Sequence, residues 1–373
     1  MQTVYLISSN ASKEYILDAL EVLSLPFGMV QHFRYQLKWL DKELKEELPL
    51  KDNSKKDSLK NYKVVICYLY QEKIDNGWEW IKIYPVRTGV LMDAYKTGEK
   101  EEDIAHFYFK VDAYIPSDKG NEIEKEIKKW RKVWNKTYAF FGKSLKNNIL
   151  TSKKESYSIF HNICTSFKKE HFKSPEGNTE YYPIFCLIEG LKTFKRRCWR
   201  KIKKTLTPEY NSLSHKSYYK IDEGSYCSFE FRIFSPENPP EFQIVLKSDE
   251  KLFSTPSKYE LRISSRYTEE SCALISRFLE RDVFTLLCFE TTCKNFDKKE
   301  PLNFHIDFPV KIKRNLFFRI VEVAGDIGFG VGTASIALSK VLGEQWSWWY
   351  WPVIGGYLTW MICKLIVKLL WRG

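Results

Sequence analysis

The sequence predicts a mixed α+β protein that ends in a two-helix transmembrane hairpin. Several segments alternate apolar and polar residues, which is the pattern of a half-buried strand. Aromatic residues make up 16% of the chain, a high share that favours β-rich packing. No charged residue stands between Trp346 and Cys363, so the C-terminal region is typical of a membrane segment.

Residues 1–146 are expected to form an α+β domain. Strands are predicted at Thr3–Ile7, Met29–Leu40, Lys63–Tyr70, Trp78–Thr88 and His106–Tyr114, and helices at Ser12–Leu23 and Asn121–Leu145. The simplest assembly of these elements is a small sheet or a partly closed barrel, covered by the helices.

One strand of this domain carries polar side chains along a single face. They are His32, Arg34, Gln36 and Lys38, and Arg87 lies near the end of another predicted strand. Cationic and amide groups in this arrangement could bind an anion. A sheet face exposed to water explains the same pattern without a ligand, and we favour that interpretation.

Residues 147–215 are expected to be a basic helical connector. Its first part, 147–180, is polar and irregular, whereas Tyr182–Leu206 has the spacing of a helix. Within it, Lys192–Lys204 holds eight Lys and Arg among thirteen residues and no acidic residue. The apolar residues Leu191, Phe194, Cys198 and Ile202 recur at helical spacing.

The candidate binding residues of this connector are cationic. They are Lys195, Arg196, Arg197, Arg200, Lys201, Lys203 and Lys204. A basic helix with an apolar stripe suits an anionic membrane surface or a nucleic-acid backbone. A core helix with a solvated lysine face would look the same. The net charge of +12 favours an anionic partner.

Residues 216–315 are expected to form a β-sandwich-like domain. Predicted strands are Ser225–Ser235, Phe242–Leu246, Tyr259–Ile263, Val283–Glu290 and Leu302–Val310, and a short helix is predicted at Glu269–Glu280. Turn-rich loops separate these short alternating segments, which is typical of two packed antiparallel sheets.

Residues 316–373 are expected to form the membrane hairpin. Trp349–Leu370 has enough apolar residues for a span, which needs about 20. Trp and Tyr residues cluster at its start, as in an interfacial aromatic belt. Basic residues lie before the first segment and at the end of the second. Positive charge on both flanks predicts that both termini lie inside, at the inner membrane, with the bulk of the chain cytosolic.

The first segment of the hairpin, 321–340, carries a stripe of small residues. The stripe includes Gly325, Gly328, Gly332 and Ser335, and Asp326 lies beside it. Such a stripe lets helices approach closely in lipid, and a buried acidic group normally faces protein or water. The glycines could serve only to pack the two helices of an anchor. Alternatively, several copies could assemble so that their polar faces line a pore. An amphipathic helix lying on the membrane surface is the third interpretation.

No catalytic, metal or cofactor site is predicted. Residues 326–333 resemble the glycine-rich motif of class I S-adenosylmethionine-dependent methyltransferases. Only 41 residues follow Gly332, too few for the sheet that this motif requires, so we interpret the likeness as a decoy. The nine cysteines include no CxxC pair, which argues against zinc. We therefore expect the protein not to be an enzyme.

A large soluble part carried on a terminal hairpin, here residues 321–370, resembles the membrane effectors of prokaryotic antiviral, abortive-infection systems. The resemblance is one of architecture, because residues 1–315 contain no diagnostic motif. It implies a soluble part that senses a partner or signal, and helices that oligomerise to disrupt the inner membrane. It also implies that the glycines pack the assembly and that Asp326 faces water.

Two other functions remain open at the level of sequence. The chain could be a passive membrane-anchored adaptor, or a membrane-tethered nucleic-acid-binding protein that uses the basic segment. The expected partners are therefore anionic membrane lipids, further copies of the same chain, a protein partner or sensor, and, in the last case, nucleic acid.

Overall fold

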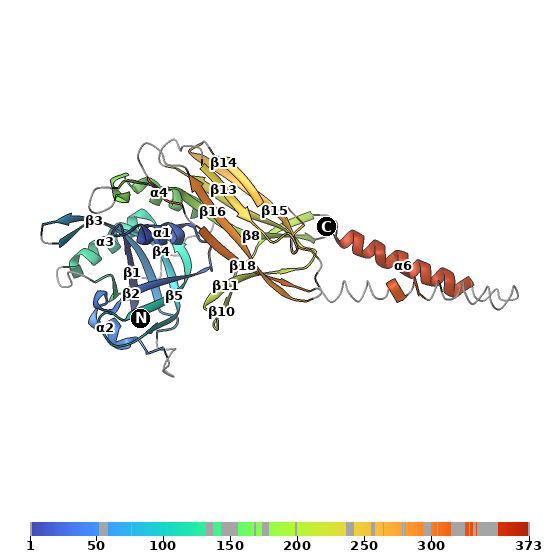
Figure 1. Ribbon diagram of the computed structural model, residues 1–373, viewed down its shortest axis with the longest axis horizontal. Helices are drawn as coiled ribbons and strands as arrows, with labels where there is room; N and C mark the ends of the chain where they lie inside the picture. Colours follow the sequence, from blue (N-terminus) through green and yellow to red (C-terminus); the bar gives the residue numbers. More distant parts are fainter. Residues whose placement is uncertain are drawn as a thin grey trace.

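The protein is described by a computed structural model, and its fold is mixed α+β with a predominance of strands. The residues described are 2–51, 59–75, 77–131, 137–142, 156–167, 169–173, 179–197, 200–235, 242–254, 258–263, 265–277, 279, 281–293, 300–303, 305–314, 325–327, 329–330, 333 and 350–371. Three main sheets form the body, and helix α6 (Tyr350–Trp371) projects away from one end of it (Figure 1).

The N-terminal sheet is a half-barrel with the strand order β2-β5-β4-β3-β1-β6. Its strands are β1 (Thr3–Ser9), β2 (Val30–Gln36), β3 (Lys63–Ile74), β4 (Gly77–Lys96), β5 (Ile104–Tyr114) and β6 (Ala139–Gly142). Only β1 and β3 run parallel, and β1 is buried along its whole length. Helices therefore cover both faces of the sheet at this strand.

Short helices surround the half-barrel. They are α1 (Lys13–Ser24), η1 (Leu37–Trp39), α2 (Lys42–Glu47), α3 (Ser117–Arg131), α4 (Ser156–Ser166) and η2 (Lys169–Phe172). Helix α1 begins where the Ser12 side chain accepts a hydrogen bond from the Tyr15 amide, as an N-cap does. The predicted α+β character of this region is confirmed.

Arg87 is fully buried rather than part of an anion pocket. Its guanidinium donates to the carbonyls of Val22 and Leu25 at the C-terminal end of α1, and to that of Asp112. A cation at this end of a helix donates to carbonyls that have no partner within the helix. It also interacts favourably with the negative end of the helix dipole. Arg87 therefore fixes α1 to the half-barrel.

Two further sheets face each other beyond the half-barrel. One has the order β10-β11-β18-β16-β13-β14 and the other β15-β12-β8-β9. Their main strands are β8 (Phe185–Arg197), β9 (Arg200–Thr205), β11 (Lys216–Asp222), β12 (Tyr226–Phe234), β13 (Phe242–Lys247), β15 (Tyr267–Ile275), β16 (Val283–Cys293) and β18 (His305–Lys313). The remaining strands of these sheets are β10 (Glu209–Asn211) and β14 (Lys258–Ile263), whereas β7 (Tyr181–Tyr182) and β17 (Glu300–Pro301) form a separate two-stranded sheet.

Aromatic side chains fill the space between these two sheets. The ring of Phe229 on β12 lies 5.1 Å from that of Phe308 on β18, and the ring of Phe231 lies 5.2 Å from that of Phe289 on β16. The same apolar cluster continues from Ile312 to Val4 of the half-barrel. The body therefore has a continuous core.

The predicted basic helix is wrong. The segment around Lys192–Lys204 forms an antiparallel hairpin of β8 and β9, in which Arg197 pairs with Arg200. The physical reason is that Leu191 and Thr193 are both buried, two residues apart, as alternate residues of a strand are. The pairing of β8 with β12 then stabilises a strand more than the helical spacing of the apolar residues stabilises a helix.

Other elements differ from the prediction for related reasons. The segment predicted as a helix at Glu269–Glu280 is mostly strand β15, whose Cys272 and Leu274 point inward. The long helix Asn121–Leu145 ends at Arg131, and β6 follows it. The strand Met29–Leu40 ends at Gln36, and the region 147–180 contains α4.

Helix α6 belongs to the segment for which the sequence predicts transmembrane helices. It is 22 residues long. In the described part of the chain, no helix combines the length and the apolar character that crossing a membrane requires.

Candidate functional site

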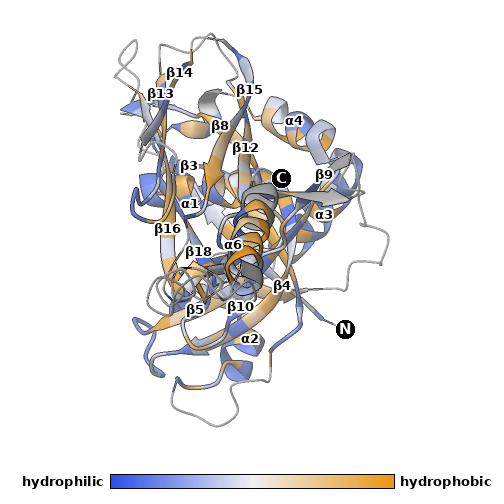
Figure 2. Ribbon diagram, turned by 90° about the vertical axis from the view of Figure 1, so that its right-hand side faces the viewer, coloured by the Kyte–Doolittle hydropathy of each residue, from blue (hydrophilic) through white to orange (hydrophobic). Residues whose placement is uncertain are grey.

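Helix α6 exposes an apolar stripe. Large apolar side chains recur three or four residues apart and are 45–57% exposed, namely Ile354, Leu358, Met361, Ile362 and Leu365. Side chains at this spacing share one face of a helix. Figure 2 shows α6 coloured mainly as hydrophobic. An exposed apolar stripe of this kind marks a surface that another molecule or a membrane covers.

The described residues between 325 and 330 lie antiparallel beside α6. A Cβ atom placed on Gly325 would lie 3.0 Å from Cβ of Cys363. One turn further along, the ring of Phe329 lies 5.7 Å from that of Tyr357 and 5.6 Å from that of Trp360. Gly325 therefore allows a close approach that a larger residue would prevent.

The other residues of the predicted stripe divide into two groups. Asp326 is exposed, as is its neighbour Ile327. Gly328, Gly332 and Ser335 lie outside the described residues. Asp326 and Gly325 are thus adjacent in the chain but differ in environment, since one faces outward and the other faces α6.

The basic hairpin contains cations that are paired and others that are exposed. At its base, Lys192 forms ion pairs with Glu189 and Glu230, and Lys203 also contacts Glu230. Lys204 is exposed. Only the backbone is described for Lys195, Arg196, Arg197, Arg200 and Lys201, which lie toward the tip.

The tip of this hairpin lies at the end of the sheets from which the chain continues to α6. Strand β8 extends past the start of β12, where the ring of Phe194 lies 5.1 Å from that of Tyr226. At this end, Ser276 donates to the Asp222 carbonyl, and Asp222 pairs with Lys313 of β18. In Figures 1 and 2 the hairpin lies close to the C-terminal end of α6.

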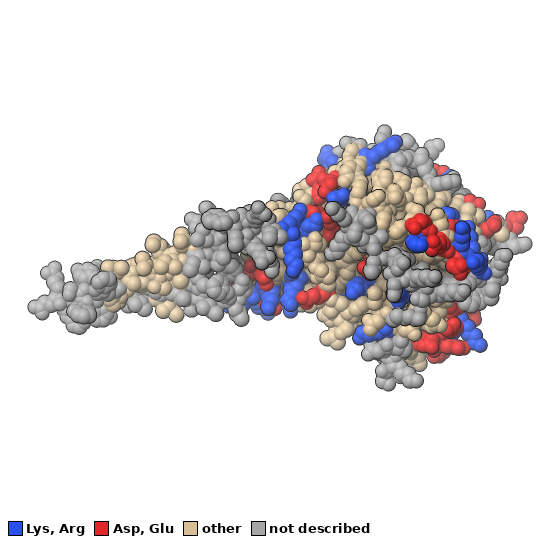
Figure 3. All heavy atoms as spheres, turned by 180° about the vertical axis from the view of Figure 1, so that it is seen from behind, with Lys and Arg blue, Asp and Glu red and all other residues tan. Residues whose placement is uncertain are grey.

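Basic and aromatic side chains therefore gather beside the apolar helix. Figure 3 shows a band of Lys and Arg on the body next to the projecting tail. The described residues at this end of β11 and β18 include Lys220, Lys311 and Lys313. The ammonium of Lys311 lies over the ring of Phe284, which is 57% exposed. We call this set, together with the hairpin tip, the basic end of the body.

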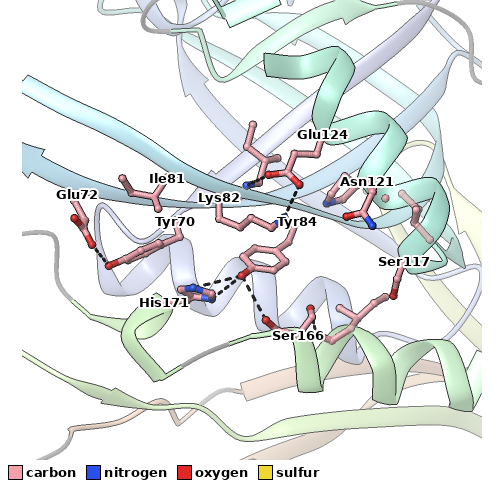
Figure 4. Close-up of a pocket in the computed structure, with 15 residues that line it drawn as sticks. Tyr70, Glu72, Ile81, Lys82, Tyr84, Ser117, Asn121, Glu124, Ser166 and His171 are labelled. Atoms are coloured by element: carbon pink, nitrogen blue, oxygen red, sulfur yellow. Dashed lines mark hydrogen bonds and ion pairs between the residues drawn. The ribbon is translucent and has the colours of Figure 1, made fainter. Parts of the chain in front are cut away.

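A pocket of about 460 Å³ lies between β4, α3 and η2 (Figure 4). Its charged groups and Tyr84 contact other lining residues. The Lys82 ammonium lies 2.6 Å from the Glu124 carboxylate, and the Tyr84 hydroxyl lies 2.8 Å from Nδ1 of His171. Because these groups already satisfy each other, the pocket offers a ligand little unpaired polarity.

A larger cleft, of about 670 Å³, opens at the carboxyl end of β1. Many of its lining residues are aromatic, namely Tyr15, Phe33, Tyr35, Trp39, Trp78, Trp80 and Tyr138. Arg34 and Asp18 also line it, and burial raises the pKa of the Asp18 carboxyl to about 6 although Arg34 lowers it. Among the described residues, neither side chain forms a direct ion pair.

This aromatic cleft has the composition of a small-molecule site, with flat apolar walls and a few polar groups. Arg34 and Gln36 belong to the polar strand face recognised in the sequence, but His32 and Lys38 do not line the cleft. The indoles of Trp39, Trp78 and Trp80 were missed, because they come together only through the strand order. Their one sequence signal is the Trp78-x-Trp80 spacing, which places both on one strand face.

Comparison with known proteins does not add a family to this geometry. The chain matches no protein-family model, and no curated protein is significantly similar to it. The functional argument therefore depends on the aromatic cleft, the basic end of the body and the C-terminal hairpin.

Proposed function

We propose that this protein is a membrane effector that acts without catalysis. The N-terminal half-barrel receives a signal, and the C-terminal hairpin enters the inner membrane. Hairpins from several copies then assemble and disrupt the bilayer. The bulk of the chain is cytosolic in this proposal, with both termini inside.

The observation that carries the proposal is the exposed apolar stripe of α6 next to the basic end of the body. Apolar side chains gain free energy on leaving water, and each one contributes about 1.5–3 kcal/mol when fully buried. Each Lys or Arg near an anionic surface contributes about 1 kcal/mol more. A partner that is apolar inside and anionic at its surface satisfies both features at once, as a lipid bilayer does.

The Gly325 contact supports assembly through the hairpin. In lipid, apolar surface alone gives helices little reason to associate, so they need close packing. Gly325 allows such packing against Cys363 within one chain. The exposed Asp326 is then placed on the outside of the helix pair, where copies would meet each other or water.

Vesicle binding by the full-length chain tests the membrane step. The chain is expected to float with vesicles that contain anionic lipid and less with zwitterionic ones. A Leu358→Glu/Met361→Glu double variant is expected to lose roughly a thousandfold in partitioning, because about 4 kcal/mol of apolar burial disappears. Leu213→Glu is the matched control, since Leu213 is 94% exposed on a turn of the body.

Two results would contradict the membrane step. One is flotation of the double variant to the same extent as the wild type. The other is a wild-type chain that ignores vesicles but binds nucleic acid with a steep salt dependence, which would favour the tethered nucleic-acid-binding alternative.

The aromatic cleft is the place that we propose for the signal. A flat ligand with an anionic group matches its indoles and Arg34. In cells that express the chain with its neighbouring genes, Trp39→Leu/Arg34→Gln is expected to abolish influx of an impermeant dye while leaving vesicle binding intact. Tyr267→Leu, an exposed aromatic outside the cleft, is the control. Undiminished influx in the cleft variant would remove the cleft from the mechanism.

A further inference from the structure

Cys288 occupies an unusual position for a free thiol. It lies on the outer face of β16, between the inward-facing Leu287 and Phe289. The other cysteines described in the body are buried, namely Cys67, Cys164, Cys186, Cys227, Cys272 and Cys293. Free cysteine normally packs inside a protein, so a partly exposed thiol on the outer face of a sheet suggests chemistry rather than packing.

Three other potential metal ligands surround this thiol. Strand register pairs Cys288 with Asp307, and Glu290 with His305. Because alternate residues of a strand share a face, all four side chains project from the same side of β16 and β18. These two strands are neighbours in the sheet (Figure 1).

The distances separate the four residues into two roles. One ligand atom each from Cys288, His305 and Asp307 lie within 4.8 Å of one another. Nε2 of His305 is 2.8 Å from the Asp307 carboxylate, whereas Nδ1 is 3.1 Å from the Glu290 carboxylate. Glu290 is itself held by Lys247 at 2.6 Å. A histidine that binds a metal usually donates its other N–H to a carboxylate, which is the place that Glu290 takes.

We propose that Cys288, His305 and Asp307 bind a zinc-class divalent cation, with Glu290 orienting His305. Sulfur, imidazole and carboxylate are the donors that Zn²⁺ takes in proteins, at about 2.0–2.3 Å. On binding, the Cys288 thiol gives its proton to solvent and forms the metal–sulfur bond as a thiolate. The His305 side chain is 51% exposed, so water has access to complete a tetrahedral set.

A simple ion-pair network is the competing explanation. A protonated His305 between Asp307 and Glu290 would account for three of the four side chains. It gives the Cys288 thiol no role beyond its contact with Asp307, although ligand atoms of Cys288, His305 and Asp307 all lie within 4.8 Å of one another. A divalent cation, by contrast, uses the thiolate and neutralises the acidic groups.

The site lies where the half-barrel meets the sheet that contains β16 and β18. Glu21 of α1 is close enough to His305 and Asp307 for their charges to affect its pKa. Strand β18 is also the last of the described strands before α6. A bound metal would therefore hold β16 and β18 together, next to the place where α1 of the half-barrel contacts this sheet.

Cobalt(II) is the probe that tests this site, because a cobalt–thiolate bond gives a charge-transfer absorption that oxygen and nitrogen ligands do not. The full-length chain in detergent, freed of metal by chelator, is titrated with Co²⁺. We expect one equivalent to produce the thiolate band and Zn²⁺ to displace it. Cys288→Ser should abolish the band, and Cys272→Ser, which removes a buried thiol of the facing sheet, should keep it.

The Glu290→Gln variant tests the orienting role. It keeps the three ligands, so the band should remain while the affinity for Co²⁺ falls roughly 10–100-fold. No thiolate band in the folded wild type, or a band that survives in Cys288→Ser, would overturn the metal site and leave the ion-pair network. An unchanged affinity in Glu290→Gln would overturn the role given to Glu290.

Discussion

The body and the C-terminal hairpin use the same residue types in opposite environments. Phe229 and Phe308 are buried between two sheets, whereas Leu358 and Met361 of α6 are half-exposed. The apolar side chains of the body core are covered by the chain itself. Those of the hairpin are covered by nothing described in the chain, which is why we propose that a membrane covers the hairpin.

The largest expected effect comes from damage to the body. Phe229→Ala removes a ring that contacts both Phe289 and Phe308. It is expected to lower the free energy of unfolding by about 3–5 kcal/mol, because a cavity replaces the ring. Chemical denaturation monitored by circular dichroism measures this. Leu358→Ala in α6 is the comparison. An equal loss of unfolding free energy in Phe229→Ala and Leu358→Ala would contradict the difference between the body and the C-terminal hairpin.

A smaller effect is expected inside the hairpin. Gly325→Leu places a side chain where Cβ of Cys363 already lies 3.0 Å away. We expect the variant to keep its affinity for anionic vesicles and to lose about tenfold in dye release, since assembly needs the close approach. Gly330→Leu is the control, because a Cβ there meets nothing within 4 Å. Equal dye release from the two variants would contradict this packing role.

The smallest effect concerns a buried carboxyl in the body. Burial raises the pKa of Glu21 to about 7, well above its ordinary value. The folded state therefore holds this proton more tightly than the unfolded state, so stability falls as pH rises from about 4.5 to 7. Glu21→Gln is expected to raise the melting temperature at pH 8 and to change it little near pH 4.

Asp326→Asn is the matched control in the hairpin, where the carboxyl is exposed. It should leave the melting temperature unchanged at both pH values. A pH-independent gain in Glu21→Gln would show that the effect comes from packing rather than from titration.

The sequence predicts strands well where one face is buried. In β5, Phe107, Phe109 and Val111 alternate with polar residues, and the structure has the strand at Ile104–Tyr114. The hairpin of β8 and β9 was missed because basic residues occur on both faces and mask the period of two. No Gly, Pro or Asn marks a turn between Arg197 and Arg200, so nothing in the sequence breaks the helical spacing.

The candidate sites were harder to predict because their residues are distant in sequence. Trp39 of η1, Trp80 of β4 and Tyr138, just before β6, are far apart in the sequence, and the rings of Trp39 and Trp80 lie 5.7 and 5.8 Å from that of Tyr138 only in the folded sheet. The Cys288 cluster has no CxxC spacing, since its members come from two strands aligned by register. Spacing rules find ligands on one element, whereas these depend on strand pairing.

The position of β18 has a mechanical consequence. This strand leads into the C-terminal segment, and it is an interior strand, parallel to β11 on one side and antiparallel to β16 on the other. A pull along it loads the hydrogen bonds of both ladders together, in shear, whereas an edge strand would peel away one bond at a time. A body tethered through β18 would resist lateral and outward forces from the membrane without unravelling.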